Sequence, residues 1–311
     1  MAPADDLWPP RNFGALPPGR SARSRAAALI LPVPYDATTS SRAGAREGPL
    51  AIIDASQEIE LYDAELGREI AAVGIHTLPE VAPDARGPEA TLRRVERVAR
   101  RLLSSGKLLV TLGGEHSITV GVVRAVRQRW PGVGVLQLDA HADLRDRYMG
   151  SPDSHACVGR RLAERGPLVQ VGMRSLSAEE AAHLRDTARQ PFWARDLVGQ
   201  ADWVPRVVDA LPEEVYVSVD LDVFDTALMP AVGTPEPGGL GWYEVLALLR
   251  AVARRKRVVA ADVVELAPRE GPAACSHLAA LLVYKLIGYV TEPASEAHDL
   301  AHLGYGEGRA R

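Results

Sequence analysis

Residues 133–143 read Val-Gly-Val-Leu-Gln-Leu-Asp-Ala-His-Ala-Asp, an apolar run that ends in two carboxylates and an imidazole. The run Val133–Leu138 does not alternate between apolar and polar residues, which is typical of a strand buried on both faces. The polar residues follow the strand at once. In open α/β sheets ligands bind beyond the carboxyl ends of the strands, so this stretch predicts both a sheet and a site at its edge.

Other apolar runs of the same kind alternate along the chain with segments of helical spacing. Pro88 suits the first turn of one helix and Gly106 closes it. Such alternation predicts an α/β fold of three layers (αβα), with a central, mostly parallel sheet covered by helices on both faces. The further strands are expected at 28–33, 108–112, 169–172, 215–219 and 258–264, and the helices from Pro49 toward Tyr62 and over 88–103, 117–130, 242–254 and 273–290.

The chain of 311 residues contains no internal repeat and no long linker. The Pro/Gly-rich stretch Met229–Gly241 is expected to be a loop, because strand and helix patterns resume directly after it. We therefore expect one domain over residues 26–311, preceded by an irregular N-terminal arm over residues 1–25.

The composition excludes several classes of protein. Apolar residues make up 47% and charged residues 24%, and the net charge is −4 with both signs interspersed, so binding of nucleic acid is not expected. No apolar run approaches the ~18 residues of a membrane span, and no membrane association is expected. Cys157 and Cys275 lie far apart without metal-binding spacing, which favours a reduced, cytoplasmic protein.

The three polar residues after the strand 133–138 are Asp139, His141 and Asp143. In extended backbone, residues i, i+2 and i+4 point the same way, so these side chains are predicted to converge. Burying that much charge without a cation would be very costly. The alternative is an exposed acidic turn, but the apolar strand that leads into it favours a metal site.

Two further motifs follow predicted strands. Gly113-Gly114-Glu115-His116-Ser117 comes after 108–112, and His116 is either a metal ligand or a hydrogen-bonded structural residue. The stretch Ser218–Asp225 contains Asp220 and Asp222, which are predicted to share one face. We interpret Asp225 as a turn cap rather than a ligand.

Together the three motifs supply six ligand-type side chains. One metal in a catalytic site needs three or four protein ligands, so six predict two divalent ions bridged by shared aspartates. Carboxylates with two imidazoles and no thiolate favour two manganese ions per subunit over other divalent metals. The predicted ligands are His116, Asp139, His141, Asp143, Asp220 and Asp222.

These motifs, in this order, resemble the signatures of the ureohydrolase family, which includes arginases, agmatinases, guanidinobutyrases and formiminoglutamases. The sequence looks most similar to agmatinase-like enzymes of bacteria and archaea, although Glu115 stands where many members have aspartate. The resemblance implies an arginase-like fold, a small guanidino compound as substrate, and a homotrimer or homohexamer.

The resemblance also implies roles for further residues. His155 falls where the family has a proton-shuttling histidine, for which a pKa near neutrality is expected; the residues alone favour a surface histidine at a helix start. Glu265 falls where a carboxylate binds the guanidinium of the substrate, and Asp143 would bind one ion and orient the attacking water. The predicted catalytic residues are therefore His155, Asp143 and Glu265.

The implied reaction is hydrolysis of a guanidino compound to urea and a primary amine, first of all agmatine to putrescine. N1-aminopropylagmatine, guanidinobutyrate and arginine remain alternatives, as do a single-zinc deacetylase and a non-catalytic polyamine-binding protein. The segment 144–154 lacks the run of small hydroxyl and amide side chains by which arginases bind the amino-acid carboxylate. Asp146 or Asp153 is expected to receive the ammonium of agmatine, whereas Arg145 or Arg147, if it faced the site, would favour guanidinobutyrate.

Overall fold

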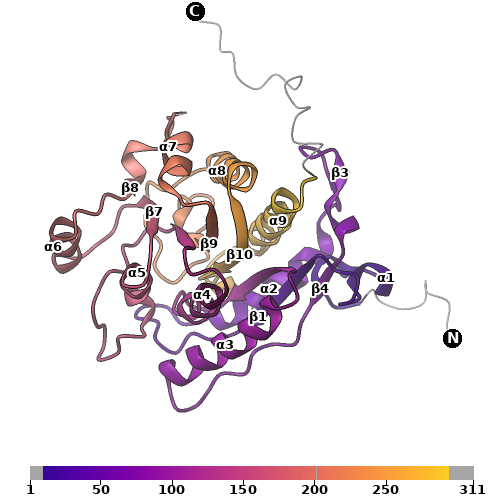
Figure 1. Ribbon diagram of the computed structural model, residues 1–311, viewed down its shortest axis with the longest axis horizontal. Coiled ribbons are helices and arrows are strands. Elements are labelled where there is room, and N and C mark those ends of the chain that lie inside the picture. The colour runs from indigo at the N-terminus through magenta and orange to yellow at the C-terminus, as the bar shows by residue number, and fades with distance from the viewer. Residues whose placement is uncertain (1–9, 201, 294–311) are drawn as a thin grey trace, which may run out of the picture.

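The computed structural model describes residues 10–200 and 202–293, and its centre is a parallel sheet of eight strands (Figure 1). The strand order is β4-β1-β5-β10-β9-β6-β7-β8, and every pair of neighbours is parallel. All carboxyl ends therefore meet at one edge of the sheet. The strands are β1 (Ala28–Val33), β4 (Ile75–Thr77), β5 (Leu108–Gly113), β6 (Gly134–Leu138), β7 (Leu168–Met173), β8 (Phe192–Trp193), β9 (Glu214–Asp220) and β10 (Arg257–Val264).

Helices cover both faces of this sheet, as expected for buried parallel strands. Ile52, Val207, Leu248 and Leu282 join the largest apolar cluster on one face. Val95, Val122 and Leu162 join a second cluster on the other face. The first face carries α2 (Gly48–Ala55), α7 (Trp203–Ala210), α8 (Trp242–Arg255) and α9 (Ala273–Val290), and the second carries α3 (Pro88–Leu103), α4 (Ile118–Arg129) and α5 (Val158–Ala163). The predicted three-layer α/β fold is thus confirmed.

The shortest elements are those that the sequence patterns did not predict. The edge strands β4 and β8 have three and two residues, too few for any periodicity to be visible. The antiparallel pair β2 (Tyr62–Asp63) and β3 (Arg68–Glu69), and the helices α5, α6 (Ala178–Asp186) and α7, were also missed. The helix expected from Pro49 toward Tyr62 ends earlier, because α2 passes into a 3₁₀ turn at Ser56–Glu58.

The predicted N-terminal arm is part of the packed fold where the structure describes it. Phe13 and Leu16 are fully buried in the core, and the N–H of Phe13 donates to Thr77 Oγ1 at 2.9 Å. A 3₁₀ turn (Phe13–Ala15) and the single helical turn α1 (Pro18–Ser21) shape this segment. Residues 1–9 of the predicted arm and 294–311 of the predicted domain lie outside the described residues.

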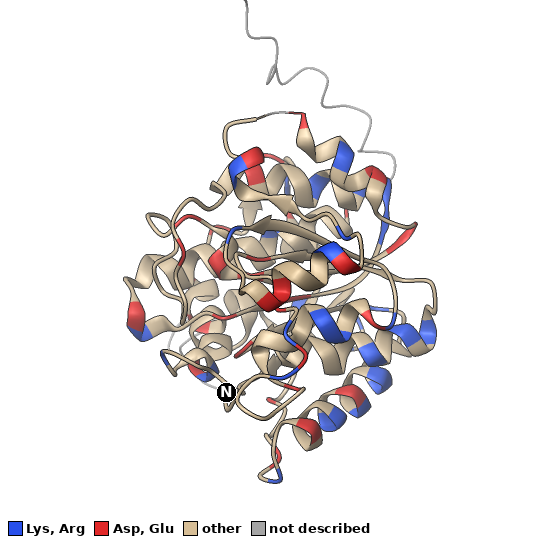
Figure 2. Ribbon diagram, turned by 90° about the vertical axis from the view of Figure 1, so that its left-hand side faces the viewer, with Lys and Arg blue, Asp and Glu red and all other residues tan. Residues whose placement is uncertain are grey.

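Helix α9 is more apolar than the sequence analysis allowed for. Its 18 residues have a mean hydropathy of 1.5, so by length and composition alone it is a candidate membrane span. However, 56% of this helix is buried inside the protein, where it packs beside α2 and α8, which is typical of a core helix. On the ribbon, basic and acidic residues are interspersed rather than gathered on one face (Figure 2), in keeping with the net charge of −4.

Candidate metal centre

The three motifs lie at the carboxyl ends of strands β5, β6 and β9. His116 follows β5, Asp139 follows β6 and Asp220 is the last residue of β9. Since β9 pairs directly with β6, and β10 lies between β5 and β9, the three strand ends meet at one point of the edge. All three residues are at most 3% exposed.

The backbone after these strands turns at Asp143 and at Asp222, whereas His141 still forms a parallel bridge with Ser175. Asp143 has a φ of 51°, in the left-handed region that non-glycine residues seldom adopt. Asp222 lies in a 3₁₀ turn (Leu221–Val223), and its N–H donates to Asp220 Oδ1 at 2.9 Å. The side chains predicted to converge do converge, but the reason given, alternation along an extended strand, was wrong.

The buried Nδ1 of His116 is the centre of the first group. It lies 3.0 Å from Asp139 Oδ2, 3.2 Å from Asp220 Oδ2 and 3.3 Å from Asp143 Oδ2. Within the described part of the chain it forms no hydrogen bond. A ring nitrogen without a hydrogen bond, facing three carboxylate oxygens, is the arrangement that a cation would satisfy.

A second group surrounds His141, whose Nδ1 lies 2.8 Å from Asp222 Oδ2 and 3.8 Å from Asp139 Oδ1. Ligand atoms of His116, Asp139 and Asp220 all lie within 4.8 Å of one another, as do those of Asp139, His141 and Asp222. Asp139 belongs to both groups. The donor set therefore fits two adjacent divalent cations that share one carboxylate.

The pKa values of the carboxyl groups in the centre are set by burial and by the neighbouring charged groups. Burial and the neighbouring Asp139 raise the pKa of Asp143 to about 7, and burial with Asp222 raises the pKa of Asp220 well above its usual range. For Asp222, burial is outweighed by His141 and by the N–H of Ala140, so its pKa falls to about 2. Bound cations would favour the ionised carboxylates throughout.

A buried carboxylate, Asp262, orients His116 through Ser218. Ser218 Oγ donates to Asp262 Oδ1 at 2.7 Å and lies 3.0 Å from His116 Nε2. Thr119 Oγ1 and the hydroxyl of Tyr216 donate to the other oxygen of Asp262. This network fixes the ring so that Nδ1 faces the acidic group.

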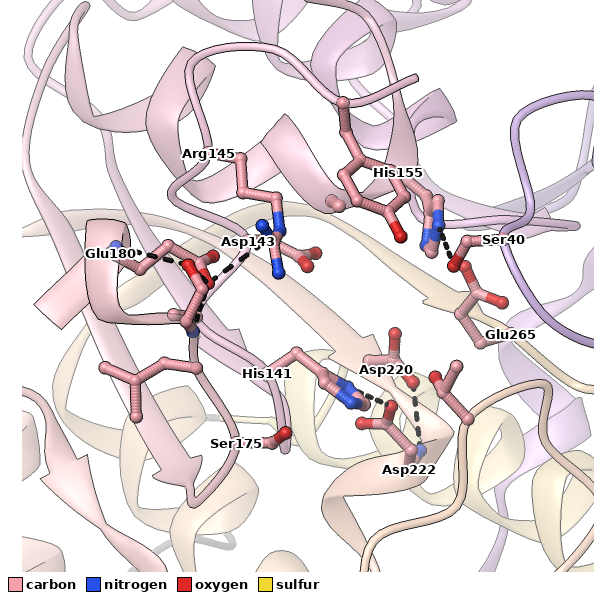
Figure 3. Close-up of a pocket in the computed structure, with 16 residues that line it drawn as sticks. Ser40, His141, Asp143, Arg145, His155, Ser175, Glu180, Asp220, Asp222 and Glu265 are labelled. Atoms are coloured by element: carbon pink, nitrogen blue, oxygen red, sulfur yellow. Dashed lines mark hydrogen bonds and ion pairs between the residues drawn. The ribbon is translucent and has the colours of Figure 1, made fainter.

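The centre opens into a cavity of about 220 Å³. Figure 3 shows Glu265, Ser40 and His155 on one side of it and Glu180, Arg145 and Ser175 on the other, with His141, Asp220 and Asp222 between them. Three candidate metal ligands thus lie between the two sides of the cavity wall.

Glu265 lies just beyond the end of β10 and has a φ of 67°, again in the left-handed region. Its Oε1 accepts the N–H of His116 at 2.6 Å. Burial is the main reason that its pKa is raised to about 8, and Glu115 adds to the effect. Among the described residues no basic side chain forms an ion pair with it, so a cationic ligand would complete this part of the site.

His155 begins a 3₁₀ turn (His155–Cys157) and lines the same cavity. Its backbone N–H donates to Thr38 Oγ1 at 3.0 Å, and its ring Nε2 lies 3.2 Å from Ser40 Oγ. Burial and the nearby His116 and His141 lower its pKa to about 4. The expected pKa near neutrality is thus not found here, and the ring is neutral at pH 7.

Glu115, which stands where many family members have aspartate, connects the first motif to the His155 segment. Its carboxylate accepts the N–H of Thr38 at 2.6 Å and the hydroxyls of Thr38 and Ser117. Thr38 Oγ1 in turn accepts the N–H of His155. Glu115 therefore shapes the loop that places the predicted proton shuttle.

Asp146 and Asp153 do not line the cavity. Asp146 is exposed and accepts from Arg161 Nη2 at 2.7 Å, and Asp153 lies 3.5 Å from Arg124 Nη2. The structure therefore does not support their predicted role in binding the substrate ammonium, because arginines from other elements of the fold already pair with them. Asp225 is the turn cap that the sequence indicated, accepting from the N–H groups of Ala227, Gly238 and Gly239.

Arg145 lines the cavity, whereas Arg147 is exposed outside it. The guanidinium of Arg145 lies 4.9 Å from the centre of the Tyr148 ring, and its Nε is 3.9 Å from Glu180 Oε2. The guanidinium of Arg145 thus already lies beside a carboxylate and an aromatic ring of the protein.

Sequence analysis missed the contribution of the segment after β7. Arg174 donates to the carbonyls of Asp222, Phe224 and Glu236, Ser175 and Glu180 line the cavity, and Glu180 forms the capping box of α6. The stretch 169–172 was predicted as a strand, so the rule applied to the other strand ends would have found these residues too.

A parallel α/β sheet with two carboxylate–histidine groups at its carboxyl edge defines a class of metal-dependent hydrolases. Within that class the chain belongs to the arginase family, whose family model matches residues 26–288. It is accordingly a ureohydrolase of a family that depends on two metal ions.

Individual relatives agree with this assignment. The chain is 40% identical over 272 residues to an N(1)-aminopropylagmatine ureohydrolase of Synechocystis, covering 85% of this chain and 89% of the relative. It is 38% identical over 262 residues to an agmatinase of Pyrococcus horikoshii, covering 84% and 90%. The solved agmatine ureohydrolase of Thermoplasma volcanium matches with a TM-score of 0.80 and 29% identity, covering 94% and 98%. The predicted family and hydrolase chemistry are confirmed, and the deacetylase and non-catalytic alternatives find no support here.

Proposed function

We propose that the protein hydrolyses a guanidino amine, agmatine or its N1-aminopropyl derivative, to urea and a primary amine. The observation that carries this proposal is Glu265, a buried carboxyl group without a basic partner among the described residues, at one end of the cavity beside the candidate metal ligands. The relatives named above as agmatinase and N(1)-aminopropylagmatine ureohydrolase support the same substrate class.

We propose that two manganese ions are bound by the two groups of ligands. Oxygen donors with two imidazoles and no thiolate suit manganese, because hard cations prefer such ligands. Two divalent ions bound there would supply an activated water, since such ions lower its pKa from ~15.7 to about 7. The residues that would hold them are His116, Asp139, His141, Asp143, Asp220 and Asp222.

Glu265 would bind the guanidinium and fix its carbon above the metal groups. Its pKa of about 8 means that the empty site favours the protonated acid, and a guanidinium cation would favour the carboxylate. Its backbone strain, with φ at 67°, costs about 1–3 kcal/mol and persists because His116 and its neighbours hold the carboxyl group in place.

His155 would move the proton that the leaving amine requires. It is neutral at pH 7, so its ring nitrogen can accept the proton that the attacking water loses and pass it to the amine nitrogen as the C–N bond breaks. Its backbone N–H donates to Thr38 Oγ1, and this hydrogen bond places the ring at the cavity wall beside Ser40 and Glu265.

Guanidinobutyrate is the second candidate substrate, because Arg145 lines the cavity and arginine pairs well with carboxylates. We rank it second because Glu180 and the Tyr148 ring already surround that guanidinium. An arginine substrate would have to place its carboxylate in the same surroundings.

The test is release of urea by manganese-loaded protein, measured as kcat/KM for agmatine, N1-aminopropylagmatine, guanidinobutyrate and arginine under one condition. The proposal expects one of the two guanidino amines to have the highest value. A higher value for guanidinobutyrate or arginine would overturn the substrate assignment.

A further inference from the structure

A substrate with a cationic tail needs a second anionic group at the end of the cavity away from Glu265. This inference rests on the proposed function, because only a guanidino amine has such a tail. Three of the acids in the cavity wall, Asp143, Asp220 and Asp222, belong to the metal groups. The acid that receives the tail must therefore be sought elsewhere.

Glu180 lines the side of the cavity away from Glu265, but both of its carboxylate oxygens already accept hydrogen bonds from the protein. Its Oε1 accepts the N–H of Leu144 at 2.9 Å, and its Oε2 accepts both the N–H and the hydroxyl of Ser177. Arg145 lies 3.9 Å from the same oxygen, and Glu180 is only 3% exposed. It is a structural carboxylate that caps α6 and balances Arg145.

The carboxylate of Glu236, in the loop between β9 and α8, accepts fewer hydrogen bonds than that of Glu180. Its Oε1 accepts the hydroxyl of Ser175 at 2.8 Å and lies 3.7 Å from His141 Nε2, and both of these residues line the cavity. Its side chain is 37% exposed, and no Lys or Arg pairs with it within residues 10–200 and 202–293. Glu236 does not itself line the cavity, but it is a partly exposed carboxylate in contact with two residues that do.

The backbone of Glu236 is fixed, so its carboxylate has a defined place. Arg174 Nη2 donates to the carbonyl of Glu236 at 2.8 Å and to that of Asp222 at 2.6 Å. The same loop passes beside Glu265, because a Cβ at Gly233 would lie 4.0 Å from Glu265 Oε2. Three residues span at most about 10 Å, so the backbone of Glu236 lies no further than that from Gly233.

We infer that Glu236 binds the distal ammonium of the substrate and thereby selects guanidino amines over guanidino acids. Glu265 and Ser175, the partner of Glu236, lie on opposite sides of the cavity (Figure 3), so the two ends of an extended guanidino amine meet a carboxylate each. The partial exposure of Glu236 leaves space for a longer tail to continue into solvent. A carboxylate tail at the same place is repelled.

The experiment compares three substrates that differ only in the tail: agmatine, the neutral butylguanidine, and guanidinobutyrate. Glu236→Gln keeps the size of the side chain and removes its charge. We expect a loss of about tenfold in kcat/KM for agmatine, mainly through KM, because a charged hydrogen bond at a partly exposed site is replaced by a neutral one. The kcat/KM for butylguanidine should change less than about twofold in the same variant. Glu236→Asp, which keeps the charge, should retain part of the kcat/KM for agmatine.

Glu214→Gln is the matched control, because Glu214 is a partly exposed carboxylate (28%) at the opposite end of β9 and pairs with Arg257. Metal content is measured on every variant. Equal losses for agmatine and butylguanidine, or a loss of metal, would mean that Glu236 acts through His141, and would overturn the inference while the proposed function stands. An unchanged agmatine value would overturn it as well. A parent protein that releases urea from none of the three would overturn both.

Discussion

The backbone N–H of His116 donates to Oε1 of Glu265 at 2.6 Å. One hydrogen bond thus connects a candidate metal ligand, which follows β5, with the carboxyl group proposed to bind the guanidinium, which follows β10. These strands are neighbours in the sheet, so the distance between the metal groups and the substrate cation is set by the sheet itself.

Glu265→Gln should lower kcat/KM for agmatine by about 10²–10³-fold, because the guanidinium loses its charged partner in a buried site. The amide oxygen of Gln still accepts the N–H of His116, so the fold and the metal content should remain. Steady-state kinetics together with elemental analysis checks this. Parental kinetics would show that the guanidinium is bound elsewhere.

Asp139→Ala should lose both metal ions, since Asp139 belongs to both ligand groups. His116→Ala and His141→Ala should each weaken one site more than the other, because each histidine belongs to one group only. Elemental analysis of manganese-reconstituted protein should give about two equivalents for the parent and fewer than one for Asp139→Ala. A parent that saturates near one equivalent contradicts the two-metal proposal.

His155→Ala should keep its metal ions and lose about 10²–10⁴-fold in kcat, the usual contribution of a general acid–base residue. The neighbour Ser40 contacts only Nε2, so Ser40→Ala serves as a milder comparison and should retain most of the activity. The measurement is kcat against pH for both variants. If His155→Ala followed the parent across the pH range, another group would be the shuttle.

Glu65→Gln should destabilise the protein in a pH-dependent way. Glu65 accepts from Lys285 at 2.7 Å, from Arg250 at 2.6 Å and from Tyr289 at 2.7 Å. Burial raises its pKa, but Lys285 and Tyr289 outweigh burial and the net pKa is lowered. The stabilisation is therefore present above the unfolded pKa of about 4.3 and is lost as the pH falls through the folded value.

We expect Glu65→Gln to cost about 1 kcal/mol at pH 7, a modest value because the side chain is 34% exposed, and much less at pH 3. Urea unfolding of parent and variant at both pH values, with chelator present throughout, provides the difference free of metal effects. A difference that grew on acidification would contradict this sign.

The strands and the ligand candidates follow from the sequence because both are local properties. A strand buried on both faces must be apolar along its whole length, so β5, β6, β9 and β10 stand out in the sequence. Polar residues that follow such strands must come to the carboxyl edge of a parallel sheet. The sequence thus brings His116, Asp139 and Asp220 to one edge of the sheet, while the strand order β5-β10-β9-β6 decides that they meet there.

What only the tertiary structure decided are the contacts between loops. Asp146 is paired with Arg161 and Asp153 with Arg124, so two residues chosen for their nearness in sequence to the site are turned away from it. Glu236 contacts Ser175 in the cavity wall, and Arg174, far away from Glu236 in sequence, holds its carbonyl. No periodicity in the chain encodes such pairs.

The same division holds within the motifs. The sequence determined which side chains stand at the strand ends, but the left-handed turns at Asp143 and Glu265 determined where those side chains point. Non-glycine residues adopt that backbone only when contacts from other strands compensate for its cost, as the N–H of His116 does for Glu265. Local sequence specifies the chemical groups; their convergence is a property of the packed sheet edge, where several strands constrain each turn at once.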